Sequence, residues 1–144
     1  MTYSRPTSVL VLIHTDDGRV LLMRRAKPFD FWQSVTGCLE DGETHFDAAP
    51  RELFEETGLT DEGELVFSGV DRYYKIDPRW IQRFPPGTVE NHEYEWRYRV
   101  PKPVDVTLSG AEHSEFVWVP IDDAIEMVWS WTNREALEAL KATL

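Results

Sequence analysis

Three glutamates within residues 51–59 constrain this chain more than any other sequence feature, because they require both a helix and a counter-charge. Residues three and four apart on a helix share a face, so Glu52, Glu55 and Glu56 are predicted to project as one carboxylate cluster. Like charges at this spacing destabilise a bare helix by about 0.2–0.5 kcal/mol, and a divalent cation would reverse that penalty. The predicted cofactor is Mg²⁺, with Mn²⁺ as a substitute, because both ions prefer carboxylate oxygens. Considered alone, the run is better explained as a solvated acidic helix face.

The spacing of the surrounding residues favours the metal site instead. Gly37 is followed after five residues by Glu43, and seven further residues separate Glu43 from the segment 51–59, which ends on Gly-Leu. At each of these positions residues 37–59 resemble the Nudix box. The Nudix box requires particular residue types at widely spaced positions, so a chance match of residues 37–59 to all of them is improbable.

The resemblance implies roles for these residues. A Nudix loop–helix–loop presents its glutamates to metal ions, which polarise phosphoryl oxygens and lower the pKa of bound water that attacks a phosphorus. Arg51 lies one turn before Glu55 and is expected to hold that carboxylate. Glu112 stands where many Nudix enzymes supply a further carboxylate, although an ordinary loop acid is the alternative, and His113 is expected to be a positioning or core residue. The predicted catalytic residues are Arg51, Glu55, Glu56 and Glu112, and the predicted metal ligands are Glu52, Glu55, Glu56 and Glu112.

The rest of the chain predicts an α+β fold in a single domain over residues 1–144. The resemblance makes this a Nudix-type α/β/α sandwich, a mixed β-sheet with helices on both faces. A turn at residues 16–18 joins the first two strands into a hairpin. Strands are predicted at 7–13, 19–25, 31–36, 64–76, 94–100 and 113–119, and helices at 44–57, at 121–128 and after Thr132.

Two local features bear on the helices. Pro50 lies inside the helix predicted at 44–57, where proline costs about 3 kcal/mol. That helix is therefore expected to start later than Thr44 or to kink ahead of the glutamates. In the last helix Thr132 is the predicted N-cap, because Glu135 follows three residues later in a capping-box pattern.

Three further segments, 30–37, 83–87 and 129–134, resemble the bacterial dihydroneopterin triphosphate pyrophosphatases. Such enzymes release pyrophosphate from dihydroneopterin triphosphate and leave the monophosphate, a step toward folate. By this resemblance Arg24 is expected to contact phosphate, while Trp32 is assigned equally to structure or to ring contact. The predicted substrate-binding residues are Arg24, Thr36, Ser130 and Trp32.

Composition limits the partners. The net charge of −11 repels nucleic acid and favours cations between the protein and a phosphorylated substrate. The single cysteine, Cys38, fits a reducing compartment, and the apolar run 9–13 is too short to span a membrane. The expected protein is cytoplasmic, a monomer or weak homodimer, with a small phosphorylated pterin or nucleotide triphosphate as its partner and no nucleic acid or membrane.

Other functions stay open at this point. Within the Nudix class they are a nucleoside triphosphate pyrophosphatase and a dinucleoside polyphosphate hydrolase. From another class, a Nudix fold kept as a non-catalytic binding module is the alternative, although no glutamate of the box is missing.

Overall fold

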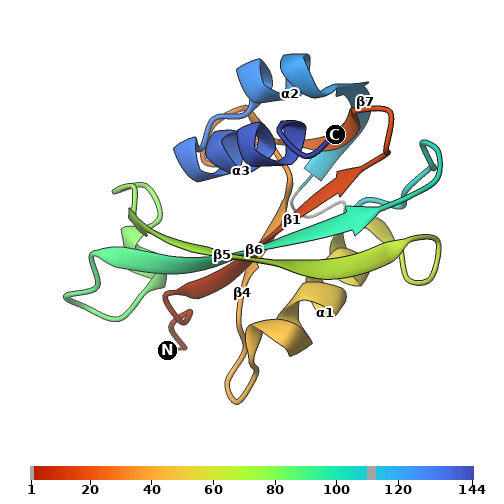
Figure 1. The fold of residues 1–144 in the computed structure, drawn as a ribbon. Coiled ribbons are helices and arrows are strands. Elements are labelled where there is room, and N and C mark those ends of the chain that lie inside the picture. The colour runs from red at the N-terminus through yellow and green to blue at the C-terminus, as the bar shows by residue number, and fades with distance from the viewer. Residues whose placement is uncertain (1, 110–112) are drawn as a thin grey trace.

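The computed structural model describes residues 2–109 and 113–144 (Figure 1). Its strands form a seven-stranded mixed sheet in the order β3-β2-β1-β6-β5, with β4 paired to β1 and β7 paired to β2. The strands are β1 (Thr7–His14), β2 (Arg19–Arg25), β3 (Phe31–Gln33), β4 (Val35–Cys38), β5 (Glu64–Lys75), β6 (Glu90–Arg99) and β7 (His113–Pro120). The helices are α1 (His45–Thr57), α2 (Ile121–Met127), α3 (Trp131–Lys141) and the short 3-10 turn η1 (Ile81–Arg83).

Helices cover both faces of the sheet, as predicted. Figure 1 shows α1 on one side and the α2–α3 pair on the other. Strand β1 is buried on both faces: Val9 and Val11 belong to the core cluster under α1, whereas Leu10 and Leu12 belong to the cluster under α2 and α3. Burial on both faces explains why the first apolar run does not alternate with polar residues. Within the described residues, no helix has the length and apolar character needed to cross a membrane.

The predicted hairpin exists only at its turn. β1 and β2 pair at His14 and Val20, and beyond that point they take different partners. β1 continues antiparallel to β4 and parallel to β6, while β2 continues antiparallel to β3 and β7. The strand predicted at 31–36 is therefore two strands that meet at Ser34, whose backbone N–H donates to Asn133 Oδ1 at 2.9 Å. A local pattern does not predict this break, because it arises from a change of partner strand.

Helix α1 begins at His45, directly after Thr44, and ends before Gly58 in the left-handed region at φ 75°. The Asp47 carboxylate accepts the backbone N–H of Thr44 at 3.0 Å. The helix continues through Pro50, so the proline does not set its start and all three glutamates follow it on the same helix.

The predicted cap of the last helix is wrong. Ser130, with extended backbone angles, is the N-cap of α3, and Thr132 is a fully buried residue inside the first turn. The predicted capping-box acid, Glu135, instead faces Arg72 on β5 at 3.7 Å. Burial of the Thr132 side chain under the helix takes precedence over the local capping pattern.

Candidate active site

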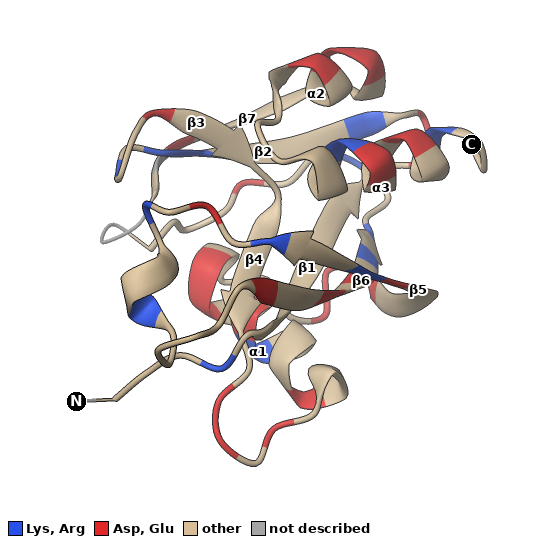
Figure 2. Ribbon diagram, turned by 90° about the vertical axis from the view of Figure 1, so that its left-hand side faces the viewer, with Lys and Arg blue, Asp and Glu red and all other residues tan. Residues whose placement is uncertain are grey.

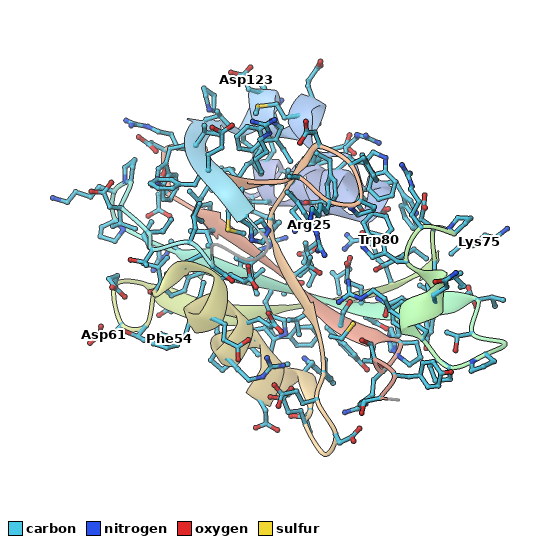
Figure 3. All side chains as sticks on the ribbon, turned by 180° about the vertical axis from the view of Figure 1, so that it is seen from behind. Arg25, Phe54, Asp61, Lys75, Trp80 and Asp123 are labelled. Atoms are coloured by element: carbon cyan, nitrogen blue, oxygen red, sulfur yellow. The ribbon has the colours of Figure 1, made fainter. Side chains whose placement is uncertain are left out.

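A cavity of about 580 Å³ opens where β1 and β2 diverge. This volume is typical of small-molecule sites, which span about 300–1,000 Å³. Its wall combines acidic, basic, aromatic and neutral polar side chains. Figure 3 shows Arg25 near the centre of the view with Trp80 beside it and Lys75 farther toward the edge of the molecule. The part of the lining contributed by α1 is Arg51, Glu52 and Glu55. The other basic residues are Arg25, Lys75 and Arg83, the aromatic rings are those of Phe31, Trp80 and Trp129, and a further polar group consists of Ser8, Tyr74 and Glu93.

Glu52 and Glu55 of α1 line this cavity, and Glu52 reaches it past a glycine. A Cβ atom at Gly37, on β4, would lie 2.1 Å from Cδ of Glu52 and 2.2 and 2.4 Å from its two carboxylate oxygens. The Glu52 side chain thus occupies the space that any other residue would fill at position 37. Figure 2 shows acidic residues along α1 and along the loop before it, next to β4.

Arg51 is the cation that the acidic residues share. Its Nε and Nη2 donate to the two carboxylate oxygens of Glu43 at 2.6 and 2.8 Å. Its Nη1 donates to Glu52 at 2.9 Å and to Glu55 at 3.1 Å, so the predicted contact with Glu55 is present. The guanidinium lowers the pKa of Glu43, and that carboxylate in turn raises the pKa of Arg51. Arg51 and Glu43 therefore form a two-pronged ion pair that ties the middle of α1 to the loop before it.

Glu52 is held in an unfavourable environment for a charge. Only 8% of the residue is exposed, and burial raises its pKa to about 7 despite the opposing effect of Arg51. A bound cation would relieve this desolvation by restoring oxygen–cation contacts in place of water.

Glu56 faces His113 at the start of β7. Its Oε2 lies 2.7 Å from Nδ1 of His113, close enough for an ion pair but without hydrogen-bond alignment, so both atoms are buried without a hydrogen-bond partner. On the far side of the ring, Nε2 of Gln33 lies 2.9 Å from Nε2 of His113. An amide nitrogen only donates, so a neutral His113 carries its hydrogen on Nδ1, facing Glu56. His113 is thus buried beside a predicted ligand, as expected of a positioning residue.

The three glutamates do not converge on one point. Over residues 2–109 and 113–144, no three Asp, Glu, His or Cys side chains are arranged to hold a metal ion together. Glu52 and Glu55 share Arg51, whereas Glu56 faces His113, so the single cluster of metal ligands stays a prediction. These glutamates still fit a hard divalent cation, because Glu52 is a buried carboxylate of raised pKa and Glu56 has a buried oxygen without a hydrogen-bond partner. Glu112 lies outside the described residues.

Two of the four predicted substrate-binding residues, Thr36 and Ser130, line the cavity. Arg24 and Trp32 pair with each other across β2 and β3 and do not line it. The Arg24 guanidinium instead donates to Asp30 and Glu115 at 3.1 and 3.2 Å.

Trp32 packs against the core under α2 and α3. Side chains alternate along a strand, so the neighbours of these two residues point into the cavity instead. Arg25, Phe31 and Gln33 are those neighbours, and all three line it.

Sequence reasoning also missed Glu93 and Tyr74. Glu93 lies in a strand where polar and aromatic residues alternate, a pattern usually produced by one solvated face. Here the polar face is covered by α3, so Glu93 is only 5% exposed. Tyr74 on β5 lines the cavity, and burial raises its pKa. The sequence signal that could have indicated Glu93 is the alternation of acidic with aromatic residues along β6.

Comparison with known proteins places this geometry in a family. The family model described as the NUDIX domain matches residues 4–140. The dihydroneopterin triphosphate diphosphatase of Escherichia coli K12 is 36% identical over 140 residues, covering 94% of this chain and 92% of that protein. The protein of the same name from Haemophilus influenzae is 37% identical over 142 residues, covering 96% and 89%. The solved structure of the E. coli dihydroneopterin triphosphate pyrophosphohydrolase matches with a TM-score of 0.92 and 32% identity over the full length of both chains.

Proposed function

The chain belongs to the Nudix hydrolase family, and from that membership we propose that it hydrolyses dihydroneopterin triphosphate to pyrophosphate and dihydroneopterin monophosphate. The whole of residues 1–144 would act as one Nudix domain. The observation that carries the proposal is a single cavity that joins the carboxylates of the Nudix box to a region walled by aromatic rings. Such a cavity holds a flat heterocycle and its phosphate chain at the same time.

The carboxylates would hold divalent cations, with Mg²⁺ as the proposed ion and Mn²⁺ as a substitute. Glu52, Glu55 and Glu56 are the described residues that would bind them, and Glu112 completes the proposed set. When bound, such ions neutralise charge on the phosphate oxygens and polarise the phosphorus under attack. The proposed general base is one of Glu55, Glu56 and Glu112.

The protein side chains supply the rest of the chemistry. Arg51 holds Glu52 and Glu55 at the cavity wall, which reduces the reorganisation needed when substrate arrives. Phe31, Trp80 and Trp129, whose ring centroids lie 5.6–5.9 Å apart, form an apolar part of the cavity wall that would exclude water from a bound substrate. Exclusion of water strengthens every electrostatic interaction between the site and the phosphates.

Three basic residues on the cavity wall, Arg25, Lys75 and Arg83, are the proposed phosphate contacts. They offset the strong negative charge of the protein where an anionic substrate enters. Arg51 is not proposed for this role, because its donors are already taken by Glu43, Glu52 and Glu55.

Arg25→Gln is expected to lower kcat/KM by about 10- to 100-fold, mainly through KM, because a charge-assisted hydrogen bond to phosphate is lost. The matched change Arg24→Gln removes only exposed ion pairs with Asp30 and Glu115 and is expected to alter kcat/KM by less than about two-fold. Steady-state kinetics of both variants checks the assignment. The reverse order of effects would restore Arg24 as the phosphate contact.

Product release tests the proposed function. With Mg²⁺ present, pyrophosphate release from dihydroneopterin triphosphate is compared with release from nucleoside triphosphates and dinucleoside polyphosphates. The pterin is expected to be cleaved fastest by a wide margin. Faster cleavage of a nucleotide would retain the Nudix chemistry but replace the substrate, and no cleavage of any compound would favour a binding module.

The setting of this activity is also proposed. With 26 acidic against 15 basic residues, the chain is unsuited to nucleic acid, and its single cysteine fits a reducing compartment. We propose the cytoplasm as its location and a monomer or weak homodimer as its working form.

A further inference from the structure

One buried carboxylate in the cavity has no role in the chemistry described above. Glu93 on β6 is 5% exposed, and its Oε1 is buried without a hydrogen-bond partner in the described part of the chain. It lies opposite Ser8 of β1, on the face of the sheet covered by α3, and both residues line the cavity. A carboxylate in this position is expensive to bury unless something compensates it.

The neighbouring acid on the same face is compensated fully. Glu95, two residues along β6 and 1% exposed, accepts from Arg72 at 2.8 Å and from Arg97 at 3.2 Å. Among the described residues, no salt bridge reaches Glu93, and the Thr132 hydroxyl and the charge of Arg72 only partly oppose the effect of burial on the pKa of its carboxyl group. Glu95 is therefore paired with two guanidinium groups, whereas Glu93 lines the cavity with one buried oxygen that has no hydrogen-bond partner.

We propose that Glu93 selects the heterocycle of the substrate by accepting two adjacent N–H groups from its edge. This inference rests on the proposed function and specifies its ring recognition. Pterins and guanine share a 2-amino-4-oxopyrimidine edge, in which a ring N–H lies beside an exocyclic amino group. Two parallel donors match the two oxygens of one carboxylate, whereas adenine offers one donor beside a ring acceptor and cannot pair in this way.

The surroundings of Glu93 suit a flat ring. Tyr74 and Ser8 line the cavity with it, and the side-chain amide of Asn91 donates to the Ser8 hydroxyl at 2.8 Å. Aromatic faces of Phe31, Trp80 and Trp129 line the same cavity and are available for stacking. A hydrogen bond from Glu93 to the edge of the heterocycle and packing of aromatic rings against its faces would together define a ring site. This site is distinct from the carboxylates of the Nudix box.

A pair of nucleotides differing in one amino group tests the inference directly. Inosine triphosphate keeps the ring N–H of guanosine triphosphate but lacks its amino group. The wild-type protein is expected to cleave guanosine triphosphate with a kcat/KM about 10- to 100-fold higher, because loss of one donor leaves a buried carboxylate oxygen unpaired. In Glu93→Gln the ratio of kcat/KM for guanosine triphosphate to that for inosine triphosphate is expected to fall to about three or less. The kcat/KM for dihydroneopterin triphosphate is expected to fall by about 10- to 100-fold. Glu90→Gln, the same change at an exposed position of β6, should leave both unchanged.

Binding of neopterin, which has the ring but no phosphate, gives a second measurement without metal or catalysis. Quenching of pterin fluorescence should report binding to the wild type and to Glu90→Gln, and at least ten-fold weaker binding to Glu93→Gln. Equal affinities, or an unchanged preference for guanosine over inosine triphosphate in Glu93→Gln, would overturn the role of Glu93 while leaving the proposed function in place. If the wild type cleaves neither pterin nor nucleotide, the proposed function fails, and neopterin binding still decides the role of Glu93.

Stability separates a recognition role from a structural one. Burial raises the pKa of Glu93 from 4.5 to about 7, so the folded protein keeps this proton to higher pH than the unfolded chain does. The contribution of Glu93 to stability therefore decreases as pH rises from 4.5 to 7. Glu93→Gln removes that decrease, and its urea midpoint at pH 8 is expected to equal or exceed that of the wild type. A large drop in the midpoint would identify Glu93 as a structural residue.

Discussion

Glu56→Gln is expected to lower kcat by about 100- to 10,000-fold, the range for loss of a group that acts on the reacting atoms. Glu56 is 5% exposed, and its Oε2 faces Nδ1 of His113 at 2.7 Å. Glutamine has the same shape, and its amide oxygen can face the hydrogen on Nδ1 as the carboxylate oxygen does, so the free energy of unfolding should change by less than about 2 kcal/mol. The variant thus removes one charge at the site and little else.

Turnover of dihydroneopterin triphosphate, Mn²⁺ binding by electron paramagnetic resonance and urea denaturation together check this expectation. Glu126→Gln, an identical change on the exposed surface of α2, is the matched control. Weakened Mn²⁺ binding with an unchanged urea midpoint would support Glu56 as a metal ligand. Near-normal turnover would remove Glu56 from the mechanism.

Gly37→Ala is expected to lower kcat/KM by about 100-fold or more, because misplacement of a reacting group by about 1 Å has effects of that size. The new Cβ would lie 2.1 Å from Cδ of Glu52, so the carboxylate must leave its place at the cavity wall. The clash involves the end of a side chain and no backbone atom, so the fold should survive with a loss of about 1–3 kcal/mol in stability.

A double-mutant cycle with Glu52→Gln shows whether the glycine acts through Glu52. If it does, Gly37→Ala should add little further loss of activity in the Glu52→Gln background. Fully additive losses would show that Gly37 matters for another reason, such as the backbone path of β4. Metal affinity measured on the same four proteins should follow the same non-additive pattern.

The helix at the centre of the site was predictable from local sequence. Its end at Gly58 and the spacing of its glutamates depend on helix periodicity and capping, which involve residues close in the chain, whereas the effect expected of Pro50 on its start is not seen. The contact of Arg51 with Glu55 is likewise local, one helical turn apart. The family resemblance of residues 37–59, the α+β class and the helices on both faces followed from the same kind of local information.

The tertiary structure decided which side chains meet across elements. Whether Arg25 or Arg24 lines the cavity depends on how β2 pairs with β3, because a shift of one residue along a strand reverses the face to which a side chain points. Glu93 is hidden only because α3 covers the polar face of β6, and no local pattern distinguishes a covered polar face from a solvated one. The contact of Glu56 with His113 joins residues 57 positions apart in the chain. Thus the sequence alone determined α1 and the carboxylate character of its candidate metal ligands. Long-range packing determined which side chains line the cavity, because strand pairing and burial depend on distant residues.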